Sequence, residues 1–154
     1  MTVTYTNELK SNVLDPLKGL IFTEFKPMDV IFEPEFNGSY MRRGQYIRYW
    51  FLESTLESVF ATGETRNYSI EVTYYFDVRR HSDKIAFDKV YSDEAEHLKR
   101  LLEDYYSYDD GTYRWHALSI NMSKPTSVAE LEEIENEDTM AIKFDVTITR
   151  NNFR

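Results

Sequence analysis

Side chains that could carry chemistry are few and scattered along this chain. The three histidines, His81, His97 and His116, lie in separate segments, and no two of them have the spacing of an HExxH zinc motif. The nearest approach to a metal motif is Glu94-x-x-His97, half of the pair that carboxylate-bridged dimetal sites repeat on a four-helix scaffold. A single copy on one helix is more typical of an exposed helix face than of a metal site.

Motifs for nucleophilic catalysis and for phosphate binding are missing from the sequence. It contains no GxSxG, GxxxxGK[ST] or GxGxxG pattern, and it has no cysteine. Its 27 acidic residues could bring two carboxylates into one cleft, but catalysis usually also needs a positioned nucleophile, base or metal set. The sequence therefore predicts a protein that is not an enzyme and that uses no metal or cofactor.

Charge and composition favour contacts with proteins over contacts with nucleic acid. The net charge of -9 and the pI near 4.8 predict repulsion from phosphate backbones. The aromatic content of 16% suits an interface as well as a core. Arg42 and Arg43 stand in the glycine-bracketed loop Asn37–Gly44, where adjacent arginines on so acidic a chain are more typical of solvated charge than of a phosphate site.

Neither end of the chain nor its interior predicts a membrane segment. The first ten residues, MTVTYTNELK, lack the basic and apolar regions of a signal peptide. No apolar run approaches the roughly 20 residues that a membrane helix needs. With 154 residues and no long linker, we expect a soluble intracellular protein made of one domain, residues 1–154.

The stretch from Gln45 to Arg80 predicts a long β-hairpin around which the other elements are arranged. Its first half, Tyr46 to Phe60, is rich in aromatic and β-branched residues, and Ala61 to Thr65 contains the turn-forming Gly63. The second half has the period of two that is typical of a half-buried strand. Its apolar positions, expected to face the core, are Ile70, Val72, Tyr74, Phe76 and Val78.

Two helices are predicted, one on each side of the hairpin in the sequence. The first covers roughly Thr6 to Leu20, and Pro16 either kinks it or opens a new turn after Asp15, while Ile21 to Pro27 reads as a connector. The second begins at Ser92, a favourable N-cap. Its apolar face comprises Ala95, Leu98, Leu101, Leu102 and Tyr105.

Shorter strand patterns complete the prediction. Val30 to Phe32 forms a short strand that Pro34 ends or places at an edge, and alternating patterns follow over Tyr113–Met122 and Met140–Thr149. The segment from Lys124 to Asp138, acidic over 130–138, reads as a solvated loop or as a loop with a helical turn around Val128 to Ile134. The sequence therefore predicts an α+β fold, in which a mostly antiparallel sheet with a long β-hairpin is packed by two helices.

This order of elements resembles the tail terminator proteins of long-tailed bacteriophages, also called tail completion or head-tail joining proteins. The resemblance spans Thr6 to Arg150 and is carried by RNYSIEVTYYF, SDEAEHLKRLL, a strand through Trp115 and the closing EDTMAIKFDVTITR. It implies a structural virion protein that forms a hexameric ring at the head-proximal end of the tail. The ring would stop tube polymerisation and join the tail to the neck and head.

The resemblance also implies partners. They are further copies of the chain, the tail tube protein and the neck or connector proteins, while DNA passes through the ring without specific binding. We expect the protein in the virion, after assembly in the host cytoplasm, with no membrane partner. Interface residues would include Leu56, Val59 and Phe60 on the hairpin and Arg42 and Arg43 at the loop tip.

Two alternatives stay open from the sequence. One is another phage neck or tail tube protein, which would differ from a terminator in its partners. The other is a small-molecule-binding or hydrolytic α+β domain, whose curved sheet would hold an aromatic pocket. That pocket would be lined by Tyr49, Trp50, Tyr75 and Trp115.

Overall fold

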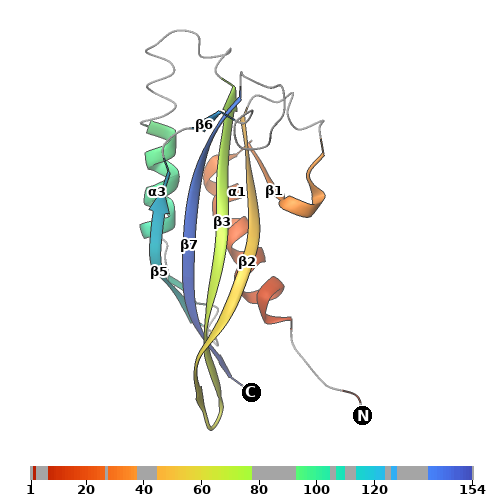
Figure 1. Cartoon of the computed structure of the whole chain (residues 1–154), viewed down its shortest axis with the longest axis vertical. Helices are drawn as coiled ribbons and strands as arrows, with labels where there is room; N and C mark the ends of the chain where they lie inside the picture. Colours follow the sequence, from red (N-terminus) through yellow and green to blue (C-terminus); the bar gives the residue numbers. More distant parts are fainter. Residues whose placement is uncertain are drawn as a thin grey trace.

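In the part of the chain that the computed structural model describes, a mostly antiparallel sheet carries two helices on one face, as Figure 1 shows. The structure describes residues 2, 7–26, 28–37, 45–77, 93–104, 107–109, 114–123, 126–127 and 139–153. Some residues singled out above lie outside these ranges: Arg42, Arg43, Val78, His81, Ser92, Tyr105 and the segment 130–138. The predicted α+β class, with its long hairpin and two helices, is confirmed.

Within the described residues, seven strands make one sheet in the spatial order β1-β2-β3-β7-β5-β4, and β6 also pairs with β7. Their bounds are β1 Asp29–Phe32, β2 Gln45–Phe60, β3 Gly63–Asp77, β4 Ser107–Asp109, β5 Arg114–Met122, β6 Thr126–Ser127 and β7 Thr139–Phe153. Among the described strands, only β1 and β2 pair in parallel. β6 lies within the segment predicted as a loop, so that prediction is wrong at Thr126 and Ser127. Pro34 follows β1 in a 3-10 turn, η2 (Glu33–Glu35), so β1 is a short edge strand as predicted.

The predicted hairpin is the pair β2 and β3, but its turn is tighter than expected. The pairing runs from Gln45 opposite Phe76 to Phe60 opposite Gly63, and β3 pairs along its whole length with β7. Gly63 lies so close to β7 that a Cβ there would collide with the backbone oxygen of Asn152 and lie 2.9 Å from the Cα of Phe153. A glycine is therefore required at position 63. Gly63 is also the first residue of β3, whereas the predicted turn extended to Thr65.

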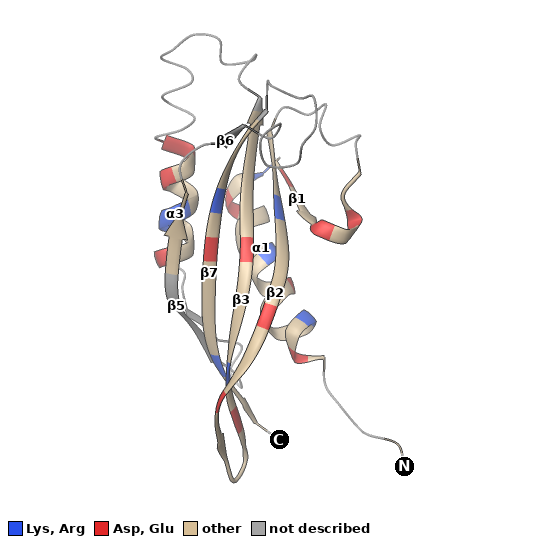
Figure 2. Ribbon diagram, in the orientation of Figure 1, with Lys and Arg blue, Asp and Glu red and all other residues tan. Residues whose placement is uncertain are grey.

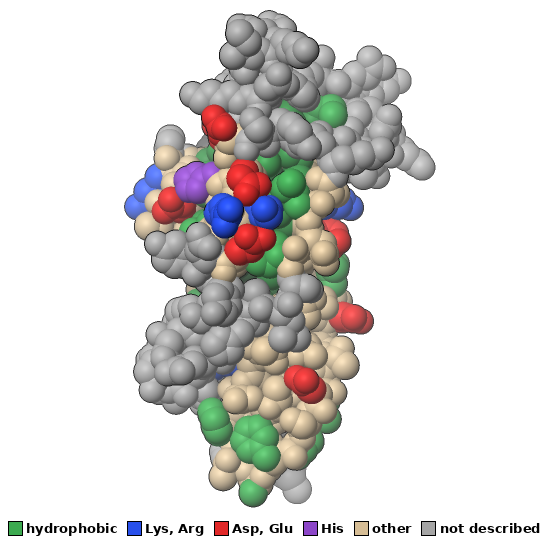
Figure 3. All heavy atoms as spheres, turned by 90° about the vertical axis from the view of Figure 1, so that its left-hand side faces the viewer, with side chains coloured by type: hydrophobic (Ala, Val, Ile, Leu, Met, Phe, Trp, Pro, Cys, Tyr) green, Lys and Arg blue, Asp and Glu red, His purple; other side chains and the backbone are tan. Residues whose placement is uncertain are grey.

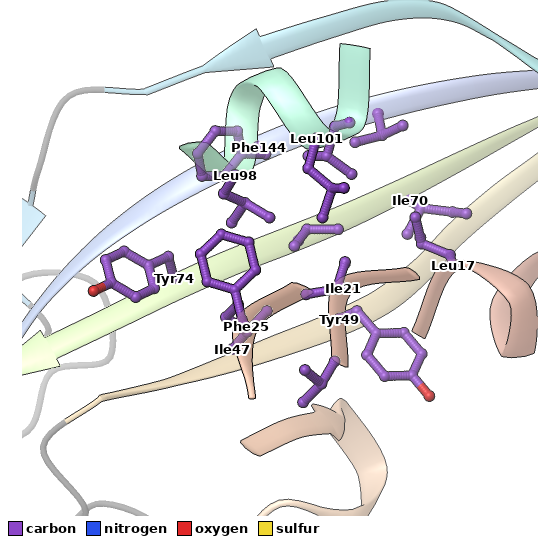
Figure 4. Close-up of a cluster of buried hydrophobic side chains, with 14 of the residues drawn as sticks. Leu17, Ile21, Phe25, Ile47, Tyr49, Ile70, Tyr74, Leu98, Leu101 and Phe144 are labelled. Carbon is purple, nitrogen blue, oxygen red and sulfur yellow. The ribbon is translucent and has the colours of Figure 1, made fainter. Parts of the chain in front are cut away.

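The core lies between one face of the long strands and both helices. Four of the five predicted positions of β3 are buried there, namely Ile70, Val72, Tyr74 and Phe76, and the fifth lies outside the described ranges. Leu98 of α3 (Ala95–Asp104) is 0% exposed, and Ala95, Leu101 and Leu102 are buried beside it. Figure 4 shows Leu98 and Leu101 of α3 and Ile21 and Phe25 of α1 (Asp15–Phe25) directed onto the same strands.

The first helix is longer than predicted and begins with an irregular turn. A π-helical turn, η1 (Lys10–Leu14), leads into α1 (Asp15–Phe25), in which Pro16 is the second residue. The expected connector from Ile21 to Pro27 is wrong, because Ile21 and Phe25 continue the apolar stripe and are buried. The predicted cap at Asp15 is wrong, because Asp15 is itself the first residue of α1 and Leu14, in helical conformation, stands at the N-cap position. The disturbance before Pro16 takes the form of the π-helical turn.

A buried arginine from the far end of the chain completes this turn. Pro16 has no N–H to give to the carbonyl of Asn12, four residues earlier. That carbonyl instead accepts a hydrogen bond of 3.0 Å from Nη1 of Arg150, whose residue is 1% exposed. Nε of Arg150 donates to Oδ1 of Asn152 at 2.7 Å, and Nδ2 of Asn152 donates to the hydroxyl of Tyr68 at 2.8 Å. This polar network ties the first helix to the base of the hairpin.

The face of the sheet away from the helices carries a second, smaller cluster. Tyr46 and Tyr75 stack with ring centroids 4.8 Å apart. Arg48 forms an ion pair with Glu33 and lies 3.8 Å from the ring centroid of Phe36. These contacts fasten the segment after β1 to β2. No helix within the described ranges is long and apolar enough to cross a membrane.

Candidate interaction surface on the hairpin and a cleft between the helices

The far half of the hairpin extends beyond the part of the sheet that the helices cover, as Figure 1 shows. Pairing with β1 ends at Tyr49, and every residue of β2 from Leu52 to Val59 is exposed. In the described part of the chain, the helix-facing core of β2 reaches no further than Phe51, which is partly buried. What remains is a ribbon formed by the ends of β2, β3 and β7.

Apolar side chains lie on both sides of this ribbon at its end. Val59 is 71% exposed, Leu56 47% and Phe153 44%. The rings of Phe60 and Phe153 meet edge to face with centroids 5.7 Å apart. We call these four residues the tip patch, and Figure 3 shows hydrophobic side chains at this lower end of the molecule.

The tip patch unites the three predicted hairpin residues and adds one that sequence reasoning missed. Leu56 pairs with Arg66 and Val59 with Glu64, so both point to the helix side of the sheet. Phe60 and Phe153 flank Gly63, one position further along, and point to the other side. Phe153 was missed because the clean alternation of the last strand ends at Thr149, whereas pairing with β3 carries β7 on to Phe153. Arg42 and Arg43 lie outside the described residues.

The helix-free side of the ribbon is mostly polar, and the hydroxyl of Thr149 donates to Oε2 of Glu57 there at 3.5 Å. It carries hydroxyl and amide side chains at successive register positions of the three strands. They are Thr55, Ser58, Thr65, Asn67, Thr149 and Asn151. The Thr65 hydroxyl donates to Oδ1 of Asn151 at 2.6 Å. Leu56 and Val59 thus lie on the helix side of the ribbon, whereas Phe60 and Phe153 stand at the end of the helix-free side, beyond these polar residues.

A cleft of about 460 Å³ lies where α1, α3 and the first residues of β1 and β2 meet. Its lining is Glu24, Phe25, Lys26, Met28, Asp29, Gln45, Glu94 and His97. Nε2 of His97 lies 2.7 Å from Oε1 of Glu24, and the His97 ring packs on Phe25 with centroids 4.7 Å apart. These contacts join the two helices across the cleft.

The two residues of the Glu94-x-x-His97 motif are engaged by protein groups rather than aimed at a common point. Oε2 of Glu94 accepts hydrogen bonds from Nε2 of Gln45 at 3.0 Å and from the hydroxyl of Tyr74. Burial first, and then the hydrogen bond and charge of Glu94, raise the pKa of Tyr74. Within the described residues, no group of three or more His, Asp or Glu side chains could hold a metal ion.

The predicted aromatic pocket does not form from the residues expected to line it. Tyr75 pairs with Tyr46, whereas Tyr49 pairs with Val72, so Tyr49 and Tyr75 are buried on opposite faces of the sheet. Trp50 is 39% exposed, and the side chain of Trp115 is outside the described part. Tyr46, the partner of Tyr75, and Tyr49 are three residues apart on β2, and residues an odd number apart on a strand point to opposite faces. The pocket prediction is therefore wrong.

Burial also makes Tyr49 a source of alkaline sensitivity. Burial, followed by the charges of Asp15 and Glu35, raises the pKa of Tyr49 to about 12. Between pH 10 and 12 the unfolded chain ionises this tyrosine while the folded chain does not, so the free energy of unfolding falls as pH rises, by about 2 kcal/mol. Urea unfolding at pH 9 and pH 11.5 should show a smaller fall for Tyr49→Phe, and an equal fall in both proteins would contradict this cause.

Comparison with known proteins shows the fold. No protein-family model and no curated protein matches the chain. Among the solved structures that match, one superposes with a TM-score of 0.61 and 13% sequence identity, covering 98% of this chain and 99% of the other. The name of that protein describes no activity. At so low an identity the likeness shows the fold alone, and it extends over nearly the entire length of both chains.

Proposed function

We propose that this chain is a tail terminator protein of a long-tailed bacteriophage. In this role it is a structural component of the virion, not an enzyme, and needs no cofactor. Six copies form a ring at the head-proximal end of the tail, stop polymerisation of the tube and join the tail to the neck and head. The observation that supports this best is the projecting hairpin with its exposed tip patch.

The tip patch supports an assembly role because it is costly to leave in water. Leu56 and Val59 are large apolar residues at the end of a ribbon that the described helices do not reach. Exposed apolar surface of this kind, bordered by polar residues, usually marks a protein interface. Contacts between different surfaces of identical subunits produce a ring when the rotation closes, and the hairpin then reaches a neighbouring subunit or the tube below.

Charge supports a channel through which DNA slides without binding. From Gln45 to Asp77 the hairpin carries five acidic and two basic residues, and Figure 2 shows acidic positions recurring along it toward the tip. A wall rich in Lys and Arg would hold the DNA by releasing counterions, whereas a negative wall lets it pass. We therefore propose a channel wall of net negative charge.

A second candidate is a small-molecule-binding or hydrolytic domain, which the cleft of about 460 Å³ favours. Its lining is polar, with Glu24 and Glu94 already engaged by His97, Gln45 and Tyr74. A neck or tail tube protein is a third candidate. It would use the same hairpin surface and differ in its place on the particle.

Electron microscopy of particles that carry a labelled copy of the protein distinguishes these candidates. For a terminator we expect label and six-fold density in one ring at the head-proximal end of the tail, and particles lacking the protein should show overlong tails unattached to heads. Label along the whole tube would indicate a tube protein instead. A protein absent from purified particles would contradict any structural role in the virion.

A further inference from the structure

The outer edge of β2 has the properties of a strand-pairing site. β1 pairs with Tyr46 to Tyr49 only, so from Trp50 to Phe60 no strand of the described residues lies on that edge. In Figure 1 this part of β2 borders the sheet below β1. Residues Leu52 to Val59 are all exposed, so the backbone N–H and C=O groups on this side are accessible to another chain.

Most devices that prevent unwanted pairing are missing from this edge. Natural edge strands are usually protected by lysine, proline, bulges or very short length. Trp50 to Phe60 contains no lysine and no proline, and it exposes Leu52, Leu56 and Val59. Two bulges, near Leu52 and Glu57, do interrupt the pairing with β3, but Glu53 to Leu56 between them is a regular stretch.

Charge decides what kind of chain fits the edge. Glu53 and Glu57 are its only charged residues. If two copies of β2 paired about a two-fold axis at Thr55, Glu53 of one copy would stand opposite Glu57 of the other, and like charges directly opposite destabilise a strand pair. A basic strand would place opposite charges there and could also cover the neighbouring leucines.

We propose that the outer edge of β2, from Glu53 to Phe60, binds an extended segment of a partner protein in which Lys or Arg alternates with apolar residues. The segment adds a strand to the sheet. Its backbone pairs with β2, its basic side chains lie near Glu53 and Glu57, and its apolar side chains cover Leu56 and Val59. This inference concerns the isolated subunit and does not depend on the role in the tail.

A synthetic peptide tests the proposal without knowledge of the natural partner. The probe is the acetylated and amidated octapeptide Thr-Lys-Val-Lys-Val-Lys-Val-Thr, titrated into the full chain by calorimetry. We expect saturable binding that weakens at least tenfold in Glu53→Lys/Glu57→Lys. A probe with Glu in place of Lys should bind the unaltered chain at least tenfold more weakly, but should bind the double variant better than the Lys probe does.

Two further measurements separate strand addition from charge attraction alone. N-methylation of every second probe residue leaves one pairing edge and should preserve binding, while methylation of every residue should abolish it. Hydrogen exchange should show probe-dependent protection at backbone amides between Glu53 and Phe60. Binding that survives full methylation, or protection confined to other strands, would overturn the proposal. Dimerisation of the chain through this edge would also overturn the proposal. Sedimentation would show it as a concentration-dependent dimer that is lost in Glu53→Lys/Glu57→Lys.

Discussion

Shortening the hairpin should abolish the joining of tails to heads while the domain stays folded. Deletion of Leu56 to Thr65 is the simplest form of this change. The pairing register allows a cleaner one, in which residues 56–66 are replaced by Asn-Gly, because Thr55 and Asn67 face each other and a two-residue turn of this type closes such a pair. The variant loses most of the tip patch but keeps every helix-facing core residue from Phe51 to Ile70.

The expected result is a monomer with a cooperative unfolding transition and a loss of infectious particles of at least a hundredfold. Circular dichroism and thermal unfolding check the fold, and electron microscopy of lysates should show separate heads and tails. The physical reason is that Leu56, Val59 and Phe60 support the proposed contact with a neighbouring subunit or the tube, whereas they contribute little to the core. Normal assembly by this variant would contradict the proposed role of the hairpin.

Two matched variants of full length separate the effect of the apolar tip patch from the effect of hairpin length. Leu56→Ser/Val59→Ser removes apolar surface from one side of the ribbon, and Ser58→Ala/Thr65→Ala changes the polar side at neighbouring positions. We expect the first to fail in assembly and the second to assemble. The opposite pattern would assign the contact to the polar side.

The second strand of the hairpin and the second helix could be predicted from the sequence because each has one unbroken period. Alternation along β3 places Ile70 and Val72 on one face without knowledge of any partner. Likewise, Leu98 and Leu102 recur at helical spacing and are buried in α3. For these elements local pattern and tertiary packing agree, so burial follows from the sequence.

The first helix shows where local reasoning ends. Pro16 predicts an irregular helix, because it has no N–H to donate to the carbonyl of Asn12. The donor that takes its place is Arg150, which lies on the last strand. In the sequence Arg150 follows a strand and looks like surface charge. Only the pairing of β7 with β3 brings it beneath the helix.

Site residues were harder to predict than elements because they depend on register. Tyr49 and Tyr75 are both tyrosines in aromatic strands, and nothing local distinguishes them. Because Tyr75 pairs with Tyr46 and Tyr49 pairs with Val72, they lie on opposite faces of the sheet. Phe153 joins the tip patch because Gly63 lies beside it across the turn. Neither relation leaves a local signal, whereas Leu56 and Val59 could be expected at an interface from the length of the hairpin alone.

Replacing Leu98 by alanine should be the most damaging single truncation on α3. Leu98 is 0% exposed and belongs to the cluster that joins both helices to β3 and β7. Truncating a buried leucine removes its transfer free energy and leaves a cavity, which together cost about 2 to 5 kcal/mol. Because a domain of this size has a free energy of unfolding of roughly 5 to 15 kcal/mol, urea unfolding should show the midpoint falling by a large fraction while the m-value is unchanged.

A neighbour on the same helix provides the control. The Arg100 side chain is 63% exposed and pairs with Glu96 one turn earlier. Arg100→Ala should therefore cost no more than about 0.5 kcal/mol, which is the usual worth of such a pair on a helix surface. The contrast tests whether α3 is held by its buried stripe or by its surface ion pairs. Equal losses for Leu98→Ala and Arg100→Ala would mean that the helix does not pack on the sheet through Leu98, and that the core described above is wrong.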